Sequence, residues 1–194
     1  MLEVLHEIYP KAPVYCAFYN NETLGKNASK FEKWNVITSW GRLLPFWQRL
    51  ISPYRVFSKK FFESFDLVEF DLVISSSNAY MAKAVKVPNG VHICYCHTPP
   101  RFLYGYATAL NWKKNFLMRI LGEVLNHFMR VWDFEASQGV DHFIANSKEI
   151  QGRIQKFYRR SSEVIYPPVD LEKFNGEATK GEYFLVVSRL VASK

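Results

Sequence analysis

The chain has 194 residues, a length that suits one domain, or one domain with part of another. Its hydrophobic content of 48% and charged content of 22% allow a sizeable core and exclude the disordered class. The formal net charge of +7 favours anionic partners such as nucleotides, phospholipid head groups or nucleic acid, without choosing among them.

Three cysteines, without a recognisable signal peptide, argue against a disulfide framework and for a reducing compartment. No apolar run is long enough to span a bilayer. We therefore expect a cytoplasmic protein, with peripheral attachment at the inner membrane face as an option. Both ends look cut, because the first residues read as the middle of a helix and the last stop where a helix would begin.

The first half of the chain mixes short apolar runs with polar stretches. Ser52 as an N-cap, followed by Pro53, marks the start of a helix. In chain order, the patterns predict a helix over 2–9, a strand over 14–19, a loop over 20–30 and a helix from Pro53 to about residue 65.

The second half alternates buried-type strands with helices. Asn146, with Glu149 three residues later, predicts a capped helix start. In order, the patterns predict strands at 71–75, 91–96, 142–145 and 164–166, with helices at 79–86, 111–138 and after 146. This alternation predicts an α/β fold with a Rossmann-like parallel sheet flanked by helices. Residues 175–181 form a polar linker between a domain at 1–174 and the opening strand of a second domain at 182–194.

Polar side chains follow four of the predicted strands, in the groups Ser75–Asn78, His97–Thr98, Asn146–Ser147 and Ser188–Arg189. Ligands of open parallel sheets bind outside the carboxyl ends of the strands. The sequence therefore predicts a ligand site at this edge, without naming the ligand.

Two sets of residues in these groups have competing interpretations. His97 could transfer or share a proton near neutral pH, or simply end a strand and bond the backbone, and we give the two equal weight. Arg189 and Lys194 follow a strand at a helix start, where they could hold a phosphate or be solvated surface charges.

Cys94, Cys96 and His92 share one strand face, but residues two apart on a straight strand do not converge on one tetrahedral ion. We therefore expect buried, reduced thiols and no metal site. Residues 42–62 interleave aromatic side chains with Arg and Lys. A membrane-facing patch, a core-facing stripe with a solvated basic face, and a single-strand nucleic-acid surface all fit, and we favour the second.

Four segments together resemble family 4 glycosyltransferases, of the mannosyltransferase-like branch that builds cell-surface polysaccharides: ICYCHTPPRFLY (93–104), WDFEASQGVDHFIANSKEIQGRIQKFY (132–158), VIYPPVDLEKF (164–174) and YFLVVSRLVASK (183–194). The resemblance runs over nearly the whole chain, with its motifs in order. It implies a GT-B fold, in which an acceptor-side domain (1–174, lacking its first strand) faces a donor-side domain that begins at 182. It also implies retaining, metal-independent transfer from a nucleotide sugar such as GDP-mannose, with no cofactor.

Residue by residue, the resemblance makes His97 the cleft histidine near the transferred sugar, and Asn146 and Ser147 the turn that lines the cleft. Arg189 and Lys194 match the pair that clamps the donor diphosphate, and Arg101 is a weaker candidate for an acceptor or phosphate contact.

Two departures from the family pattern affect function. The Gly-rich loop after the first strand is missing, and the pair of glutamates spaced Glu-x7-Glu should lie beyond Lys194. We therefore expect an inactive piece of a glycosyltransferase that acts on a glycan or lipid-linked acceptor. The alternative is a non-catalytic membrane-surface or partner-binding module that keeps only the acceptor half.

Overall fold

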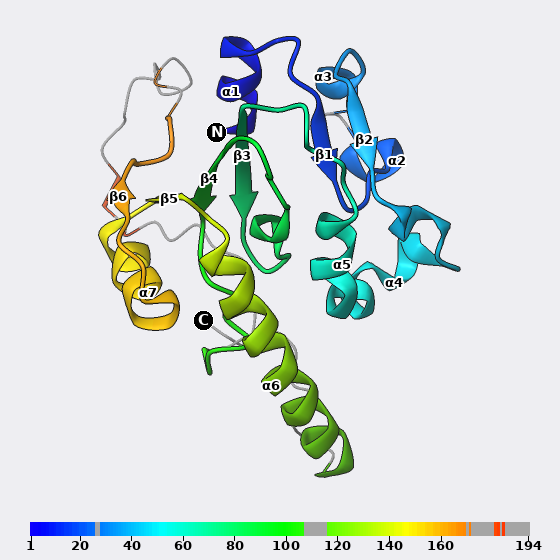
Figure 1. Ribbon diagram of the computed structural model, residues 1–194, viewed down its shortest axis with the longest axis vertical. Helices are drawn as coiled ribbons and strands as arrows, with labels where there is room; N and C mark the ends of the chain where they lie inside the picture. Colours follow the sequence, from blue (N-terminus) through cyan, green and yellow to red (C-terminus); the bar gives the residue numbers. More distant parts are fainter. Residues whose placement is uncertain (26–27, 107–115, 170, 172–180, 183, 185–194) are drawn as a thin grey trace.

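The computed structural model describes residues 1–25, 28–106, 116–169, 171, 181, 182 and 184. Parallel strands are flanked by helices, as Figure 1 shows, which confirms the predicted α/β, Rossmann-like class. The linker and second-domain start expected at 175–194 lie almost wholly outside the described residues.

Short elements make up the first half. In order they are α1 (Leu2–Ile8), β1 (Val14–Cys16), α2 (Asn21–Leu24), α3 (Ala28–Phe31), β2 (Val36–Thr38), the 3-10 turn η2 (Trp40–Leu43), α4 (Trp47–Tyr54), the 3-10 turn η3 (Arg55–Phe57) and α5 (Ser58–Glu63). The second half holds β3 (Leu72–Ser77), the 3-10 turn η4 (Ala82–Ala84), β4 (Val91–Cys96), α6 (Phe116–Gln138), β5 (His142–Ala145), α7 (Lys148–Tyr158) and β6 (Glu163–Val164).

The strands form two separate parallel sheets. β1 pairs with β2, and the other four follow the order β3-β4-β5-β6. The larger sheet buries the face that carries Ser75, Cys94 and Phe143. Its other face is more open, since Leu72 and Val91 are 44% and 42% exposed.

Two buried clusters support the larger sheet. One gathers Phe61 and Phe62 of α5 with Met81, Leu103 and Met129, and the other packs Tyr158 and Ile154 of α7 against β4 and β5. A charged pair lies inside this core: Lys83 of η4 donates to Asp133 of α6, and both side chains are almost fully buried. Apolar packing therefore holds the helices to the sheet, and this ion pair joins η4 to α6.

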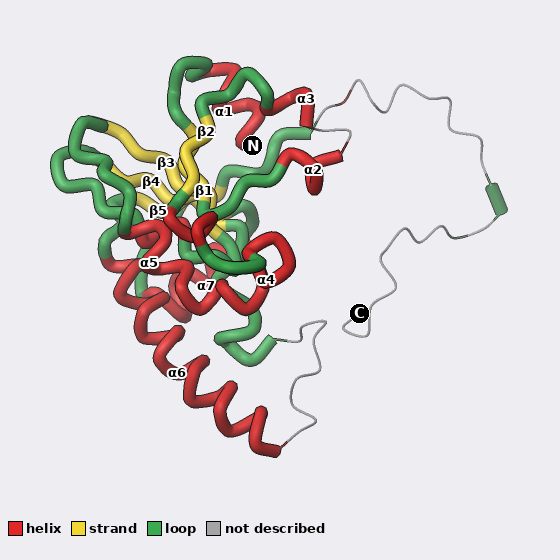
Figure 2. The backbone as a smooth tube through the Cα atoms, turned by 90° about the vertical axis from the view of Figure 1, so that its right-hand side faces the viewer, coloured by secondary structure: helices red, strands yellow, loops and turns green. Residues whose placement is uncertain are grey.

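Helix α6 reaches well beyond the sheet. Figure 1 and Figure 2 both show its first turns projecting away from the strands. The helical-period stripe of Phe116, Ile120, Val124 and Phe128 is accordingly 45–68% exposed, and only the last turns pack on the core. The first half of this apolar stripe is thus largely solvent-facing.

Several expected elements differ from those observed. Residues 20–30 are not a plain loop, because the Asn20 side chain accepts from the Glu22 N–H and caps α2. The three-residue strand β2 was not predicted. Residues 79–86 form only the turn η4, because the backbone leaves the helical region at Val85, where ψ is 147°.

The helix expected to begin at Pro53 begins earlier, at Trp47. A kink at Leu50, with φ −103° and ψ 21°, interrupts α4. Pro53 therefore falls in the first turn of the second piece, where its missing N–H costs no hydrogen bond. The predicted start is therefore wrong, because Ser52 lies inside α4 and does not cap it.

Candidate functional site

The carboxyl ends of the strands are aligned in one row. The register pairs Ser77 with Cys96 and Cys96 with Ala145. His97 and Asn146 each stand one residue beyond that row, on neighbouring strands about 4.8 Å apart. The structure thus brings these two predicted site residues to the same edge.

His97 is held by a residue of the adjacent strand. Its ring Nε2 lies 2.8 Å from the Ser76 hydroxyl. Its main-chain N–H donates to the Ser77 main-chain carbonyl at 2.9 Å. The Tyr95 ring meets the imidazole edge-on, with centroids 5.2 Å apart. His97 therefore has both a backbone and a side-chain anchor, so the two interpretations of this histidine are not mutually exclusive.

The pKa of His97 is lowered from its ordinary value by partial burial and, second, by the positive charge of the Met1 ammonium. The imidazole is consequently neutral at pH 7. One ring nitrogen of a neutral imidazole donates and the other accepts. Because Ser76 engages Nε2, Nδ1 is the nitrogen that can meet an incoming hydroxyl group.

Ser147, and not Asn146, caps the following helix. Its hydroxyl accepts from the Ile150 N–H at 3.3 Å, and α7 begins at Lys148. Glu149 does not close the expected capping box but pairs with Arg153 at 3.0 Å. The cap prediction is therefore wrong by one residue. At the edge of the sheet the Asn146 Oδ1 instead accepts from the Ser147 hydroxyl at 3.2 Å.

Arg101 lies in the turn after β4 with an exposed side chain, and no contact places it beside His97. Arg153 of α7 reaches this loop, as do Arg130, which donates to the Leu103 carbonyl, and Arg55, which lies over the Phe102 ring. The Arg153 guanidinium donates to the Thr98 hydroxyl at 3.4 Å and stacks 4.1 Å from the centroid of the Tyr106 ring. Sequence reasoning missed Arg153 because a helical arginine four residues after a glutamate resembles any surface pair.

Arg189 and Lys194 lie outside the described residues. Cys94 and Cys96 are free, buried thiols, and His92 bonds the Ser75 hydroxyl at 2.8 Å. Within the described part of the chain, no three His, Cys, Asp or Glu side chains gather closely enough to hold a metal ion.

The aromatic and basic segment 42–62 divides in two. Phe61 and Phe62 are core residues, as the structural interpretation predicts. Leu43 and Phe46 are instead 84% and 74% exposed, and Phe46 adopts a left-handed backbone with φ of 53°. The first part of the segment therefore presents bare apolar side chains next to the exposed Arg42.

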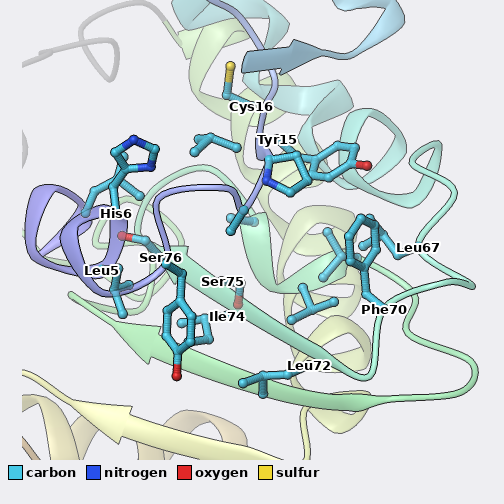
Figure 3. Close-up of a pocket in the computed structure, with 18 of the residues that line it drawn as sticks. Leu5, His6, Tyr15, Cys16, Leu67, Phe70, Leu72, Ile74, Ser75 and Ser76 are labelled. Atoms are coloured by element: carbon cyan, nitrogen blue, oxygen red, sulfur yellow. The ribbon is translucent and has the colours of Figure 1, made fainter. Parts of the chain in front are cut away.

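A deep groove lies between the two sheets (Figure 3). Its volume is about 740 Å³. In Figure 3, Leu5 and His6 of α1 lie on one side, and Leu67 and Phe70 on the other. Ser76 both lines the groove and bonds His97, so the groove adjoins the candidate site.

A parallel α/β domain with polar groups gathered at the carboxyl edge defines the class of Rossmann-like ligand-binding domains. The family model described as Glycosyltransferase Family 4 matches residues 14–173. The chain therefore belongs to Glycosyltransferase Family 4, and its role is glycosyltransferase-like. No curated protein and no solved structure matches it. None of the helices within the described residues has both the length and the apolar character needed to cross a bilayer.

Proposed function

We propose that the chain is the acceptor-side part of a retaining, metal-independent glycosyltransferase. It would act with a nucleotide-sugar donor such as GDP-mannose and a glycan or lipid-linked acceptor, in cell-surface polysaccharide synthesis. The observation that carries this proposal is the hydrogen bond between Ser76 and His97 at the carboxyl edge, in a chain of Glycosyltransferase Family 4. The mannosyltransferase branch rests on the resemblance of the sequence motifs alone.

Each residue of the edge has a role in this proposal. Neutral His97 uses Nδ1 to orient or polarise a sugar hydroxyl, while Ser76 fixes the other ring nitrogen. Asn146 offers its amide NH2 to the same sugar, while its Oδ1 accepts from the Ser147 hydroxyl. Arg189 and Lys194 offset the charge that develops on the leaving nucleotide diphosphate.

The isolated 194-residue chain is proposed to be inactive, because the family resemblance places the glutamate pair of the donor pocket beyond Lys194. The test incubates the chain, and the product of the longer reading frame that the proposal requires, with radiolabelled GDP-mannose and a membrane lipid extract. We expect labelled lipid only with the longer product. Turnover by the isolated chain contradicts the proposal.

The role of His97 is tested in the longer product. His97→Ala should lower kcat/KM by about 100-fold or more, the usual worth of a positioned proton-sharing group. His142→Ala is the matched control, because His142 is exposed at the opposite, amino end of β5. Equal activity of the two variants would exclude His97 from the reaction.

A second candidate, a membrane-surface module, is favoured by Leu43 and Phe46. These exposed side chains stand beside exposed Arg42 and Arg49, a pairing that suits the boundary of an anionic bilayer. A left-handed backbone costs a non-glycine residue about 1–2 kcal/mol. Phe46 has this backbone, although the residue is 74% exposed and gains little packing from it.

Co-sedimentation with vesicles tests this candidate. The chain should bind phosphatidylserine vesicles at low salt and lose binding at high salt, because surface charges are then screened. Phe46→Gly should lower binding without unfolding the chain, since glycine adopts the left-handed backbone freely. Binding that ignores both salt and Phe46→Gly would contradict the surface proposed here.

A further inference from the structure

Helix α6 has two unlike faces. Its inner face packs on the core through Met129 and Asp133, which are 3% and 0% exposed. Its outer face, on the opposite side of the helix, consists of apolar residues that are each 42–57% exposed: Ile120, Leu121, Val124, Leu125, Phe128 and Val131. An apolar stripe of this kind normally lies against another element, so the outer face lacks a partner among the described residues.

The outer face lies on the part of α6 that leaves the sheet. Figure 1 and Figure 2 both show these turns projecting from the body of the domain. The face ends toward the core at Glu135, whose carboxylate pairs with the Lys59 ammonium of α5 at 2.7 Å. The projecting turns are therefore accessible to a second molecule from the side opposite the core.

The outer face has the residue spacing of a paired helix. Leu121, Val124, Phe128 and Val131 follow one another at intervals of three, four and three residues. This is the spacing of the a and d positions of a heptad, with Leu121 and Phe128 at a and the two valines at d. Side chains at this spacing insert between those of a second helix lying alongside, so the partner that fits this face is a helix.

The same four residues can supply both sides of an antiparallel pair. With a two-fold axis beside residue 126, Leu121 of one copy meets Val131 of the second copy, and Phe128 meets Val124. A two-fold contact of this kind is self-complementary, because each residue pair occurs twice. Both layers place a large side chain against a small β-branched one, an alternation that fills space without voids.

The area and charge of the outer face also suit a second copy. Burying its six apolar residues in both molecules would remove roughly 1,000 Å² from water, the area at which specific interfaces begin. The charged residues near its margins, Arg119, Glu123 and Arg130, have mixed signs. A helix that binds anionic lipid instead has a polar face rich in Lys and Arg, so a protein partner fits better than a bilayer.

We propose that the outer face of α6 is a self-association surface, through which two copies of the chain form an antiparallel helix pair. The inner faces of the two helices then point away from each other, so the two domains lie on opposite sides of the pair and do not collide. Because a two-fold contact is closed, the product is a dimer and not a filament. The inference goes beyond the proposed function and does not rest on it.

Sedimentation velocity of the 194-residue chain tests the association, over a concentration range of about 1–100 μM. We expect a monomer that converts to a dimer as the concentration rises. Val124→Glu places an unpaired charge in a central layer and should raise the dimer dissociation constant at least about tenfold. Leu43→Glu is the matched control, because Leu43 is an exposed leucine of η2 and should leave the constant unchanged. Circular dichroism verifies that both variants remain folded.

Disulfide cross-linking tests the orientation, in a Cys16→Ser background that leaves only buried native thiols. Val124→Cys chains carrying a size tag are mixed with untagged Phe128→Cys chains and oxidised. The mixed disulfide should form at least about tenfold faster than the disulfide between two Val124→Cys chains, because only the mixed pair shares a layer. Any of four results overturns the proposal: monomer at every concentration, only larger aggregates, a dimer that ignores Val124→Glu, or faster linkage of two Val124→Cys chains.

Discussion

At the scale of single residues, the core contains an ion pair between Lys83 and Asp133 whose two charged side chains are both removed from water. The second carboxylate oxygen of Asp133 accepts from the Tyr104 hydroxyl at 2.8 Å, and the Lys83 ammonium lies 4.9 Å from the centroid of the Tyr158 ring. The pair is tolerated because each charged group has partners. Removing one member leaves the other charge buried and uncompensated.

Asp133→Ala should therefore lower the free energy of unfolding by about 3–5 kcal/mol. Glu3→Ala, which breaks the exposed pair with Lys30, should cost less than about 1 kcal/mol. Urea unfolding followed by circular dichroism measures both. Similar losses for the two variants would contradict a special role for the buried pair.

His92 makes the stability of the fold sensitive to acid. Burial lowers its pKa, opposed by a backbone hydrogen bond at Gly139 and by the Asp141 carboxylate, and Ser75 is its side-chain partner. Above pH 6.5 the imidazole is neutral in both the folded and unfolded chains. Below that pH the unfolded chain takes up the proton more readily, so stability falls as the pH falls.

His92→Gln keeps a polar group near Ser75 and cannot titrate. The urea midpoint of the parent chain should therefore fall between pH 7.5 and 5.5 by more than that of His92→Gln. His142→Gln is the control, since His142 is exposed and should leave the fall unchanged. A parallel fall in all three proteins would rule His92 out as the cause.

Residue-level prediction succeeded where a side chain directly follows a strand. His97 and Asn146 could be placed at the sheet edge from the strand patterns alone. The choice among Ser75, Ser76 and Ser77 could not be made, because it depends on which face of β3 turns toward His97. Arg153 carried no local signal, since its partner Thr98 is remote in sequence.

At the scale of elements, Gly90 stands just before β4 and lies against the backbone of the segment that leads into β3. A Cβ at Gly90 would lie 2.2 Å from the Phe70 carbonyl oxygen, which belongs to the backbone and cannot swing away. Gly90→Ala should lower the free energy of unfolding by about 1–3 kcal/mol. Thermal unfolding monitored by circular dichroism measures this loss.

Gly152 is the matched control. It lies within α7, and a Cβ there meets nothing within 4 Å. Gly152→Ala should raise stability by about 0.5–1 kcal/mol, because alanine is the better helix former. Destabilisation by Gly152→Ala, or no effect of Gly90→Ala, would show that close backbone contact does not decide how an added Cβ changes stability.

Element prediction followed local pattern strength. The strands at 91–96 and 142–145 were predicted with their observed bounds, because each is a short apolar run between turn residues. β2 was missed because three residues, Val36–Thr38, give too short a pattern. The capping residue of α7 was misplaced because Asn146 and Ser147 are both good N-caps, and only the geometry distinguishes them.

At the scale of the whole molecule, the three thiols report on how tightly the parts are packed. Burial raises the pKa of Cys16 and of Cys94 to about 11, and raises that of Cys96 further. Cys94 and Cys96 are 0% and 2% exposed, whereas Cys16 is half-buried at the groove.

The native chain should therefore expose one slowly reacting thiol to a disulfide reagent at pH 8, and three after denaturation. Cys16→Ser should abolish the native reaction and leave two thiols in the denatured chain. Counting released thiolate by absorbance measures both states. Rapid native reaction of all three thiols would mean that the β4–α7 packing is looser than the structure indicates.

The general architecture was predictable, but the division of the sheet was not. Alternating apolar runs and helices indicate a parallel α/β fold. Which strands pair depends on contacts between distant segments, so no local pattern could reveal that β1 and β3 lie apart. The exposure of the first turns of α6 is likewise invisible in the sequence, because its stripe has the period of a buried helix.

The burial of Lys83 makes its chemical labelling a measure of how fast the core opens. Its ammonium is 1% exposed between η4 and α6, so acylating reagents that label surface amines can reach it only after α6 leaves the sheet. At reagent concentrations where acylation outpaces reclosing, the rate at which mass spectrometry finds Lys83 acylated would equal the rate at which η4 and α6 separate. Other lysines, such as exposed Lys30 and Lys60, would record only reagent concentration and time.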